Sequence, residues 1–261
     1  MAELNATIGN VTPRTIAIDG PAGSGKSVIG LWLAQHLGYA YLDTGVLYRA
    51  IAYVALHDSI EATDAETLAM IAETIPIEVT PPTNPEDSRG YQVMIDGTDI
   101  TDELFSPDVN KSVSIVAAHP AVRKALLPLQ RRIASAGHVV LVGRDIGTVV
   151  MPHAELKLYL DASDEVRAHR RHAQEAERGI VRTYEDVLAD VRQRDGLDQA
   201  RATAPLSAAK DAVRFDTDTM TLDEEQAAID AVGLDRDRQG VDRESLVGAP
   251  VGASLIEDIA R

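Results

Sequence analysis

The sequence predicts an α/β fold in which helices flank a five-stranded parallel sheet. Two observations favour this fold. Short apolar runs alternate with segments of helical period, and two of these runs, 138–142 and 156–160, are apolar almost throughout, as in strands that are buried on both faces. The alternation breaks only between about residues 73 and 105, where short alternating segments indicate a small antiparallel insertion.

The individual elements follow from local signals. We expect sheet strands at 14–19, 39–43, 138–142, 156–160 and 212–216, and shorter strands of the insertion at 77–80, 91–96 and 98–101. Helices are expected at 26–37, at 45–57, from the capping box Thr63-Asp64-Ala65-Glu66 to Pro76, from Ser106-Pro107, from Pro120 to Gly137, from Ser163, and from Thr183 to Gly196. Pro128 should kink the helix that contains it.

The composition argues against several classes of protein. Asp and Glu number 41 against 25 Lys and Arg, and the net charge of -16 disfavours a nucleic-acid or anionic-membrane surface. The chain has no cysteine, and no apolar run reaches the roughly 20 residues that cross a bilayer. We therefore expect a cytoplasmic protein, a monomer, with neither a nucleic-acid nor a membrane partner.

A phosphate-binding loop follows the first predicted strand. Gly20-Pro21-Ala22-Gly23-Ser24-Gly25-Lys26-Ser27 matches the pattern G-x-x-x-x-G-K-[ST] between a strand and a helix. Glycines let backbone N–H groups surround phosphate oxygens, Lys26 reaches the β- and γ-phosphates, and Ser27 offers its hydroxyl to Mg²⁺. We expect this loop, with Val28, to bind ATP. A ligand-free glycine turn is the alternative, but a lysine is rarely needed in one.

The phosphate loop alone does not separate a kinase from a GTPase, a motor or a regulatory ATPase. The sequence has no N-K-x-D guanine-reading motif, and a chain of 261 residues has little room for the coupling elements of a motor. A second anion site is predicted where Thr44 opens a helix that carries Arg49, because a helix N-terminus and an arginine both attract phosphate.

Five blocks of the sequence resemble bacterial cytidylate kinases, over about residues 14–232. They are, in order, IAIDGPAGSGKS, YLDTGVLYRA, GRDIGTVV, LDASDEVRAHRR and the pattern RD-x-x-D-x-x-R-x-x-APL at 194–206. The resemblance implies a phosphate-loop fold of the nucleoside triphosphate hydrolase type that phosphorylates CMP and dCMP. It also implies that Arg49, Arg144 and Arg201 bind the CMP phosphate, Arg194 and Asp198 the sugar, and Ser114, Arg123 and Asp145 the base.

The base-reading roles also make chemical sense. Cytosine presents an amino donor beside two acceptors, so a carboxylate and an arginine can read it directly. Uracil places an oxygen where cytosine has the amino group, which sets it against Asp145 at a cost of roughly 1–3 kcal/mol. Asp145 and Arg123 therefore favour CMP over UMP.

Three arginines follow the Ser163 cap on one helix face. Arg167, Arg170 and Arg171 are spaced by three and four residues, and the resemblance implies that they belong to a lid, about 163–185, that closes over the nucleotides. We expect Arg167 and Arg170 to contact ATP and Lys26, Arg144 and Arg170 to act in catalysis. The alternative is a solvated stripe that pairs with Glu175 and Glu177.

Some questions stay open at this level. Asp19 ends the first strand, where it could either hold a water on Mg²⁺ or satisfy the backbone of the loop. The expected organisation is a core at 14–72 and 106–232, an insertion at 73–105 in the nucleoside monophosphate-binding region, and a tail from 233 to 261. A kinase of the same fold for UMP, AMP or another small acceptor remains an alternative to a CMP kinase, as does a nucleotide-dependent switch.

Overall fold

The computed structural model describes residues 12–84, 87, 89–177, 179–201 and 203–232. The predicted tail at 233–261 lies outside these residues. A five-stranded parallel sheet forms the centre of the fold, in the order β2-β6-β1-β7-β8. Its strands are β1 (Thr15–Asp19), β2 (Ala40–Asp43), β6 (Val139–Gly143), β7 (Leu156–Asp161) and β8 (Val213–Asp216). The expected fold class is therefore confirmed.

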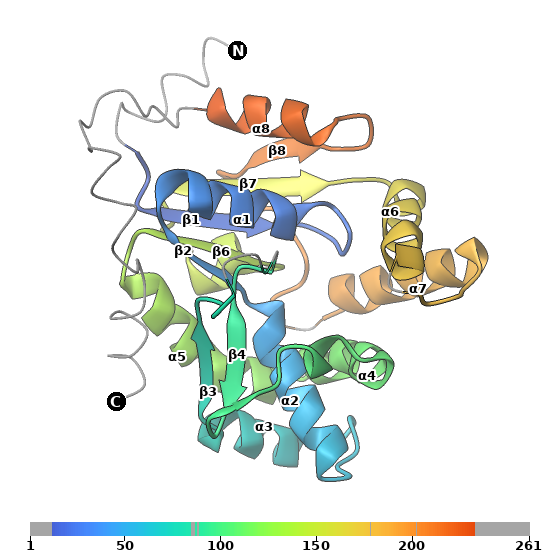
Figure 1. The fold of residues 1–261 in the computed structure, drawn as a ribbon. Coiled ribbons are helices and arrows are strands. Elements are labelled where there is room, and N and C mark those ends of the chain that lie inside the picture. The colour runs from blue at the N-terminus through green and yellow to red at the C-terminus, as the bar shows by residue number, and fades with distance from the viewer. Residues whose placement is uncertain (1–11, 85–86, 88, 178, 202, 233–261) are drawn as a thin grey trace.

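Helices cover both faces of this sheet (Figure 1). On one face, α1 (Lys26–Leu37) and α8 (Leu222–Asp230) pack against the alternate strand residues Ile16, Ile18, Val140 and Val142. On the other face, Ala17 and Leu141 pack into a larger core with α2 (Gly45–His57), α3 (Ala65–Thr74), α4 (Pro107–Ala118) and α5 (Pro120–Ser135). The near-continuous apolar strands are explained by this double burial.

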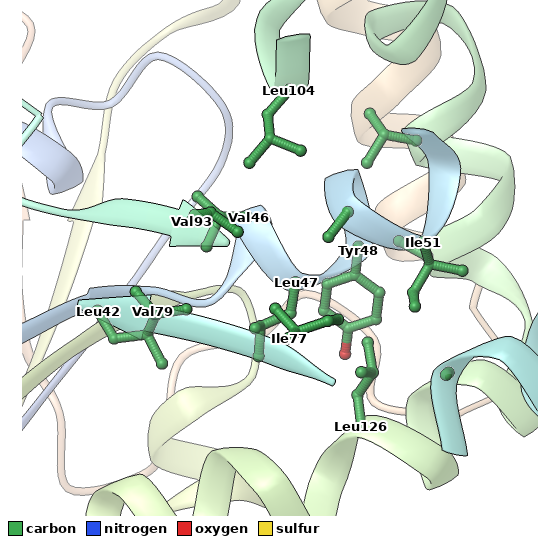
Figure 2. Close-up of a cluster of buried hydrophobic side chains, with 14 of the residues drawn as sticks. Leu42, Val46, Leu47, Tyr48, Ile51, Ile77, Val79, Val93, Leu104 and Leu126 are labelled. Carbon is green, nitrogen blue, oxygen red and sulfur yellow. The ribbon is translucent and has the colours of Figure 1, made fainter. Parts of the chain in front are cut away.

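A separate three-stranded antiparallel sheet lies beside α2. It contains β3 (Ile77–Thr80), β4 (Gln92–Ile95) and β5 (Thr98–Asp99). The turn Asp96-Gly97, in which both residues have positive φ, joins β4 to β5. Ile77 and Val79 on β3 and Val93 on β4 point into the core that α2 enters through Val46 and Leu47 (Figure 2). A short 3₁₀ turn, η2 (Glu103–Phe105), leads from this sheet to α4.

Two further helices lie beyond the carboxyl ends of the strands (Figure 1). These are α6 (Asp164–Glu177) and α7 (Tyr184–Gln199), which pack together through a small cluster of their own, Ala168, Val187 and Val191. Because this cluster is separate from the two cores of the sheet, the helix pair is attached to the sheet mainly through polar contacts at its base.

Several element boundaries differ from the expectations. The predicted capping box is wrong, because Asp64 rather than Thr63 caps α3, and its carboxylate accepts from both the backbone and the hydroxyl of Thr67. His138 has a φ of 49° and so precedes β6 rather than opening it. α5 contains Pro128 and ends at Ser135, before the expected end at Gly137. α7 runs past Gly196, its expected end, to Gln199.

Two helical glycines with different surroundings test the packing. A Cβ at Gly30 in α1 would lie 2.4 Å from Val142 Cγ2, whereas at Gly196 in α7 it would meet nothing within 4 Å. Gly30→Ala should lower the free energy of unfolding by about 1–3 kcal/mol through overpacking. Gly196→Ala should leave it unchanged or raise it by up to about 1 kcal/mol. Urea denaturation checks both, and equal effects of the two substitutions would contradict the packing of α1 on β6.

Candidate active site

A cleft of about 1560 Å³ opens at the carboxyl edge of the main sheet. It exceeds the roughly 300–1,000 Å³ of a site for one small ligand. Sixteen of the predicted site residues line it: Ala22, Gly23, Gly25, Lys26, Ser27, Val28, Thr44, Arg49, Ser114, Arg123, Arg144, Asp145, Arg170, Arg194, Asp198 and Arg201. The predicted residues that do not line it are Gly20, Pro21, Ser24 and Arg167.

The phosphate loop enters this cleft directly from β1. Gly20 is required at its start, because a Cβ there would lie 2.0 Å from the carbonyl oxygen of Leu160 on β7. Lys26 opens α1, and its Nζ donates to the carbonyl of Pro21 at 2.5 Å. Burial lowers the pKa of the Lys26 amine well below its ordinary value, and the nearby charge of Arg144 lowers it further. An anion placed here would restore the charged form.

Asp43, at the end of β2, is a site residue that the sequence reasoning missed. Its Oδ2 accepts from the Ser27 hydroxyl at 2.8 Å, and its Oδ1 accepts from the backbone N–H of Gly45 at 3.0 Å. Asp43 thus holds the last residue of the phosphate loop beside the first residue of α2. The signal available in the sequence was its position at a strand end, in the same block as Thr44.

Thr44 and Arg49, which the sequence predicts to form a second anion site, both line the cleft. Thr44 is buried, and its hydroxyl donates to the carbonyl of Val142 at 3.0 Å, so it fixes β2 against β6. Arg49 donates to the carbonyl of Leu104 and to Oδ1 of Asn110, and its guanidinium lies 4.9 Å from the centre of the Phe105 ring. Asn110 was not predicted, because only the approach of α4 to α2 places it there.

Three arginines and one aspartate converge above the end of β6. Arg144 donates to the carbonyl of Gly20 at 2.8 Å, and its Nε lies 3.2 Å from Oδ2 of Asp198. Asp198 also pairs with Arg201. Burial lowers the pKa of Arg194 to about 9, with further contributions from the charges of Arg144 and Arg49, and burial lowers that of Arg201 as well.

This convergence leaves buried positive charge without enough partners. Nε of Arg194 and both Nε and Nη1 of Arg201 are buried and make no hydrogen bond with any residue that the structure describes. Buried donors of this kind are costly unless an acceptor reaches them. The arrangement can therefore hold an anion, and it lies in the same cleft as the phosphate loop.

Arg123 and Asp145 form a buried ion pair beside these arginines. Nη2 of Arg123 lies 2.6 Å from Oδ2 of Asp145, and their side chains are only 9% and 8% exposed. Arg123 is steadied by a hydrogen bond to the carbonyl of Ala117 and by the ring of Tyr48, whose centre is 5.2 Å away. Ser114, on α4, lines the same cleft. The structure thus brings together the three residues predicted to read the base.

Of the two roles left open for Asp19, the structure contradicts one, that of satisfying the backbone of the phosphate loop. Its Oδ1 and Oδ2 accept from the backbone N–H groups of Ile146 and Gly147, each at 2.7 Å. These N–H groups open η3 (Ile146–Val150), a π-helical turn that follows Asp145 and that the sequence reasoning did not foresee. Asp19 therefore binds the loop that follows β6 rather than the phosphate loop.

The arginines of α6 differ in their surroundings. Arg167 is buried, donates to the carbonyl of Ala22 at 3.1 Å, and pairs with Asp164 and Asp195. Arg170 faces the cleft and donates to both the hydroxyl and the carbonyl of Thr217. Arg171 pairs with Glu175, one of the two partners expected if the arginines formed a solvated stripe. Asp195 and Thr217 were not predicted, because both contacts join segments far apart in the sequence.

No group of three or more His, Cys, Asp or Glu side chains in the described part of the chain could hold a metal ion. Among the same residues, no helix combines the length and the apolar character needed to span a membrane.

The fold and the site define a phosphate-loop protein with a cluster of buried arginines in the same cleft. Comparison with known proteins places it more closely, because residues 16–231 match the family model described as cytidylate kinase. A cytidylate kinase of Herpetosiphon aurantiacus is 49% identical over 225 residues, which cover 86% of this chain and 96% of that protein. Similar matches are the cytidylate kinases of Roseiflexus castenholzii (49% identical, 72% of this chain, 81% of that protein) and Enterococcus faecalis (44%, 84%, 94%). The chain belongs to the cytidylate kinase family.

Because Asp19 is buried, its contribution to the free energy of unfolding should depend on pH. Burial raises the pKa of its carboxyl from 3.8 to about 6, against the two backbone hydrogen bonds that lower it. Because this acid titrates higher in the folded chain than in the unfolded one, its contribution to stability is complete below about pH 3.8. The contribution is lost as the pH rises through 6.

The free energy of unfolding of the wild type minus that of Asp19→Asn should therefore fall by about 1 kcal/mol between pH 5 and pH 7. Chemical denaturation at several pH values measures this difference, in which the other titrating groups cancel. A difference that stays constant or rises over this range would contradict the raised pKa.

Proposed function

We propose that this chain catalyses transfer of the γ-phosphoryl group of ATP to the 5′-phosphate of CMP and dCMP, giving CDP and dCDP. The observation that carries the proposal is the meeting of three features in one cleft: the phosphate loop, the under-satisfied arginines, and the buried Arg123–Asp145 pair. The family and the names of its members support the same reaction.

The cleft offers one place for each phosphate-bearing ligand. ATP would bind with its phosphates in the loop from Gly20 to Ser27, at the N-terminus of α1, with Val28 beside it. The phosphate of the acceptor would bind to Arg49, Arg144 and Arg201, and its sugar to Arg194 and Asp198. Such an anion would supply acceptors to the buried donors of Arg194 and Arg201, which is why we expect it to bind tightly.

Asp145 and Arg123 would read the acceptor base. Their side chains are buried, so a group that they fail to match would lose its hydrogen bonds to water without replacement. The amino group of cytosine would donate to Asp145, and Arg123 would donate to the ring acceptors, with Ser114 beside them. A uracil would turn an oxygen toward the Asp145 carboxylate.

Catalysis would rest on position and charge. The acceptor phosphate already carries negative charge, so its attack needs no general base. Lys26, Arg144 and Arg170 would stabilise the charge that builds up on the transferred group, in a cleft from which the lid, α6 and α7, would exclude water. Arg167 would act from the base of this lid. The small core that α6 and α7 share supports motion as one unit, and the insertion, about 73–105, would border the acceptor side.

The residues at the phosphate loop suit Mg²⁺. This ion takes oxygen ligands and keeps several waters and phosphate oxygens, so it needs few from the protein. Ser27 would hold it, with Asp43 orienting the Ser27 hydroxyl at 2.8 Å. When bound, Mg²⁺ would neutralise charge on the β- and γ-phosphates of ATP.

A panel of acceptors tests the reaction. With ATP and Mg²⁺, release of ADP in a coupled assay should rise strongly on addition of CMP or dCMP and much less with UMP, AMP or shikimate. Uracil has no amino group to donate to Asp145, and shikimate has no base. Adenine does offer an amino donor beside a ring acceptor, so the rejection of AMP would rest on the larger size of its two rings. Turnover with none of these acceptors would overturn the proposal, and a preference for UMP or AMP would assign the chain to another acceptor.

Substitution of the base-reading carboxylate tests the assignment of Asp145. Asp145→Ala should reduce the preference for CMP over UMP, measured as the ratio of kcat/KM values, by about tenfold to a hundredfold. Asp230→Ala, at the far end of α8, removes a carboxylate outside the cleft and should leave the ratio unchanged. An unchanged ratio in Asp145→Ala, in protein whose circular dichroism matches the wild type, would remove this assignment.

A further inference from the structure

The turn that follows Asp145 begins without help from the residue that would normally cap it. Asp145 stands at the N-cap position of η3, and Asp is among the residues most favoured there, yet its carboxylate makes no capping hydrogen bond. Instead the first two N–H groups of the turn, those of Ile146 and Gly147, donate to Asp19. The capping residue, Asp19, therefore lies at the end of β1, 126 residues before Asp145 in the chain.

Because Asp19 caps the turn in place of Asp145, the Asp145 carboxylate is free to face Arg123. The two side chains meet at 2.6 Å inside the cleft, whereas a carboxylate turned back onto its own N–H groups could not point there at the same time. The charge of Asp145 also acts on Asp19, since it adds to the effect of burial in raising the pKa of the Asp19 carboxyl. Asp19 is 3% exposed and does not line the cleft, so it has no direct route to a substrate.

We infer that Asp19 is a positioning residue for acceptor specificity: by capping η3 from β1, it keeps the Asp145 carboxylate turned toward the acceptor base. This inference rests on the proposed function of Asp145. Without the Asp19 carboxylate, these two N–H groups lose the acceptor that they have now, and the side chain of Asp145, at the N-cap position of the same turn, can take its place. Its return to the N-cap role would remove it from Arg123 and from the base.

The geometry around Gly147 fits the same role. A Cβ at Gly147 would lie 3.3 Å from Oδ2 of Asp19 and 3.2 Å from Cδ of Lys157. Gly147→Ala should therefore shift the Asp19 carboxylate by a few tenths of an ångström without changing any charge. It provides a second, milder variant that acts on the same hydrogen bonds from the other side.

A double-mutant cycle tests the inference. Asp19→Asn keeps the shape of the side chain but places an amide N–H₂ against a backbone N–H. It should lower the CMP-to-UMP ratio of kcat/KM about tenfold, mainly through KM for the pyrimidine nucleotide, with KM for ATP changed less than about twofold. In an Asp145→Ala background the same substitution should change the ratio less than about twofold, because the residue through which it acts is gone.

Ile18→Val provides the matched control, because it removes a buried methylene from the neighbouring position of β1 and should leave the ratio unchanged. An equal drop in the ratio in both Asp145 backgrounds, or loss of activity through KM for ATP alone, would overturn the inference. If Asp19→Asn does not fold, Gly147→Ala replaces it in the same cycle, with the same two outcomes. A wild type that does not prefer CMP is a failure of the proposed function instead, and the acceptor panel detects it separately.

Discussion

The parallel pairing of β1 with β6 sets Asp19 beside Gly143, and the cleft depends on this register. Each strand continues into one of the two loops to which we assign the chemistry, the phosphate loop after Asp19 and the Arg144-Asp145 segment after Gly143. Parallel strands end at the same edge of a sheet, so the loops must meet there. Two polar contacts then cross between them: Arg144 donates to Gly20, and Asp19 accepts from Ile146 and Gly147.

Around this pair of loops the protein gathers positive charge in spite of a net charge of -16. Burial and mutual repulsion lower the pKa values of Lys26 and Arg194, which means that the folded chain holds these cations at a cost. Asp198 offsets part of this cost, because its carboxylate pairs with both Arg144 and Arg201. Two anionic ligands would offset more of this cost, and such a site would favour the state in which both phosphate groups are bound.

The sequence predicted the parts of this site that are local. The phosphate loop is one continuous motif between a strand and a helix, and the apolar strands showed the parallel sheet, because burial on both faces leaves no alternation to read. The roles of Arg123 and Asp145 came from a family resemblance, since 21 residues separate them in the sequence and no spacing rule joins them. The structure places them 2.6 Å apart, which their order in the chain could not show.

What the sequence did not predict depends on contacts between distant segments. Asp43, Asn110, Asp195 and Thr217 each have a partner on another element. Asp43 and Asp195 lie in blocks that carry the family resemblance, but that resemblance gave neither of them a role, and Asn110 and Thr217 lie in none of these blocks. The choice of Asp64 over Thr63 as a cap has a more local cause, since the carboxylate of Asp64 satisfies the N–H and the hydroxyl of Thr67 at once. η3 was missed because its cap, Asp19, is supplied by another strand.

The central claim is that one cleft binds the two nucleotides side by side, with their phosphates directed at each other. Isothermal titration with a compound in which adenosine and cytidine are joined through five phosphate groups tests it most directly. The account predicts one compound bound per chain, with an affinity well above that of ATP or CMP alone, because the second half binds without a further loss of translational freedom. An affinity no greater than that of ATP would contradict the account.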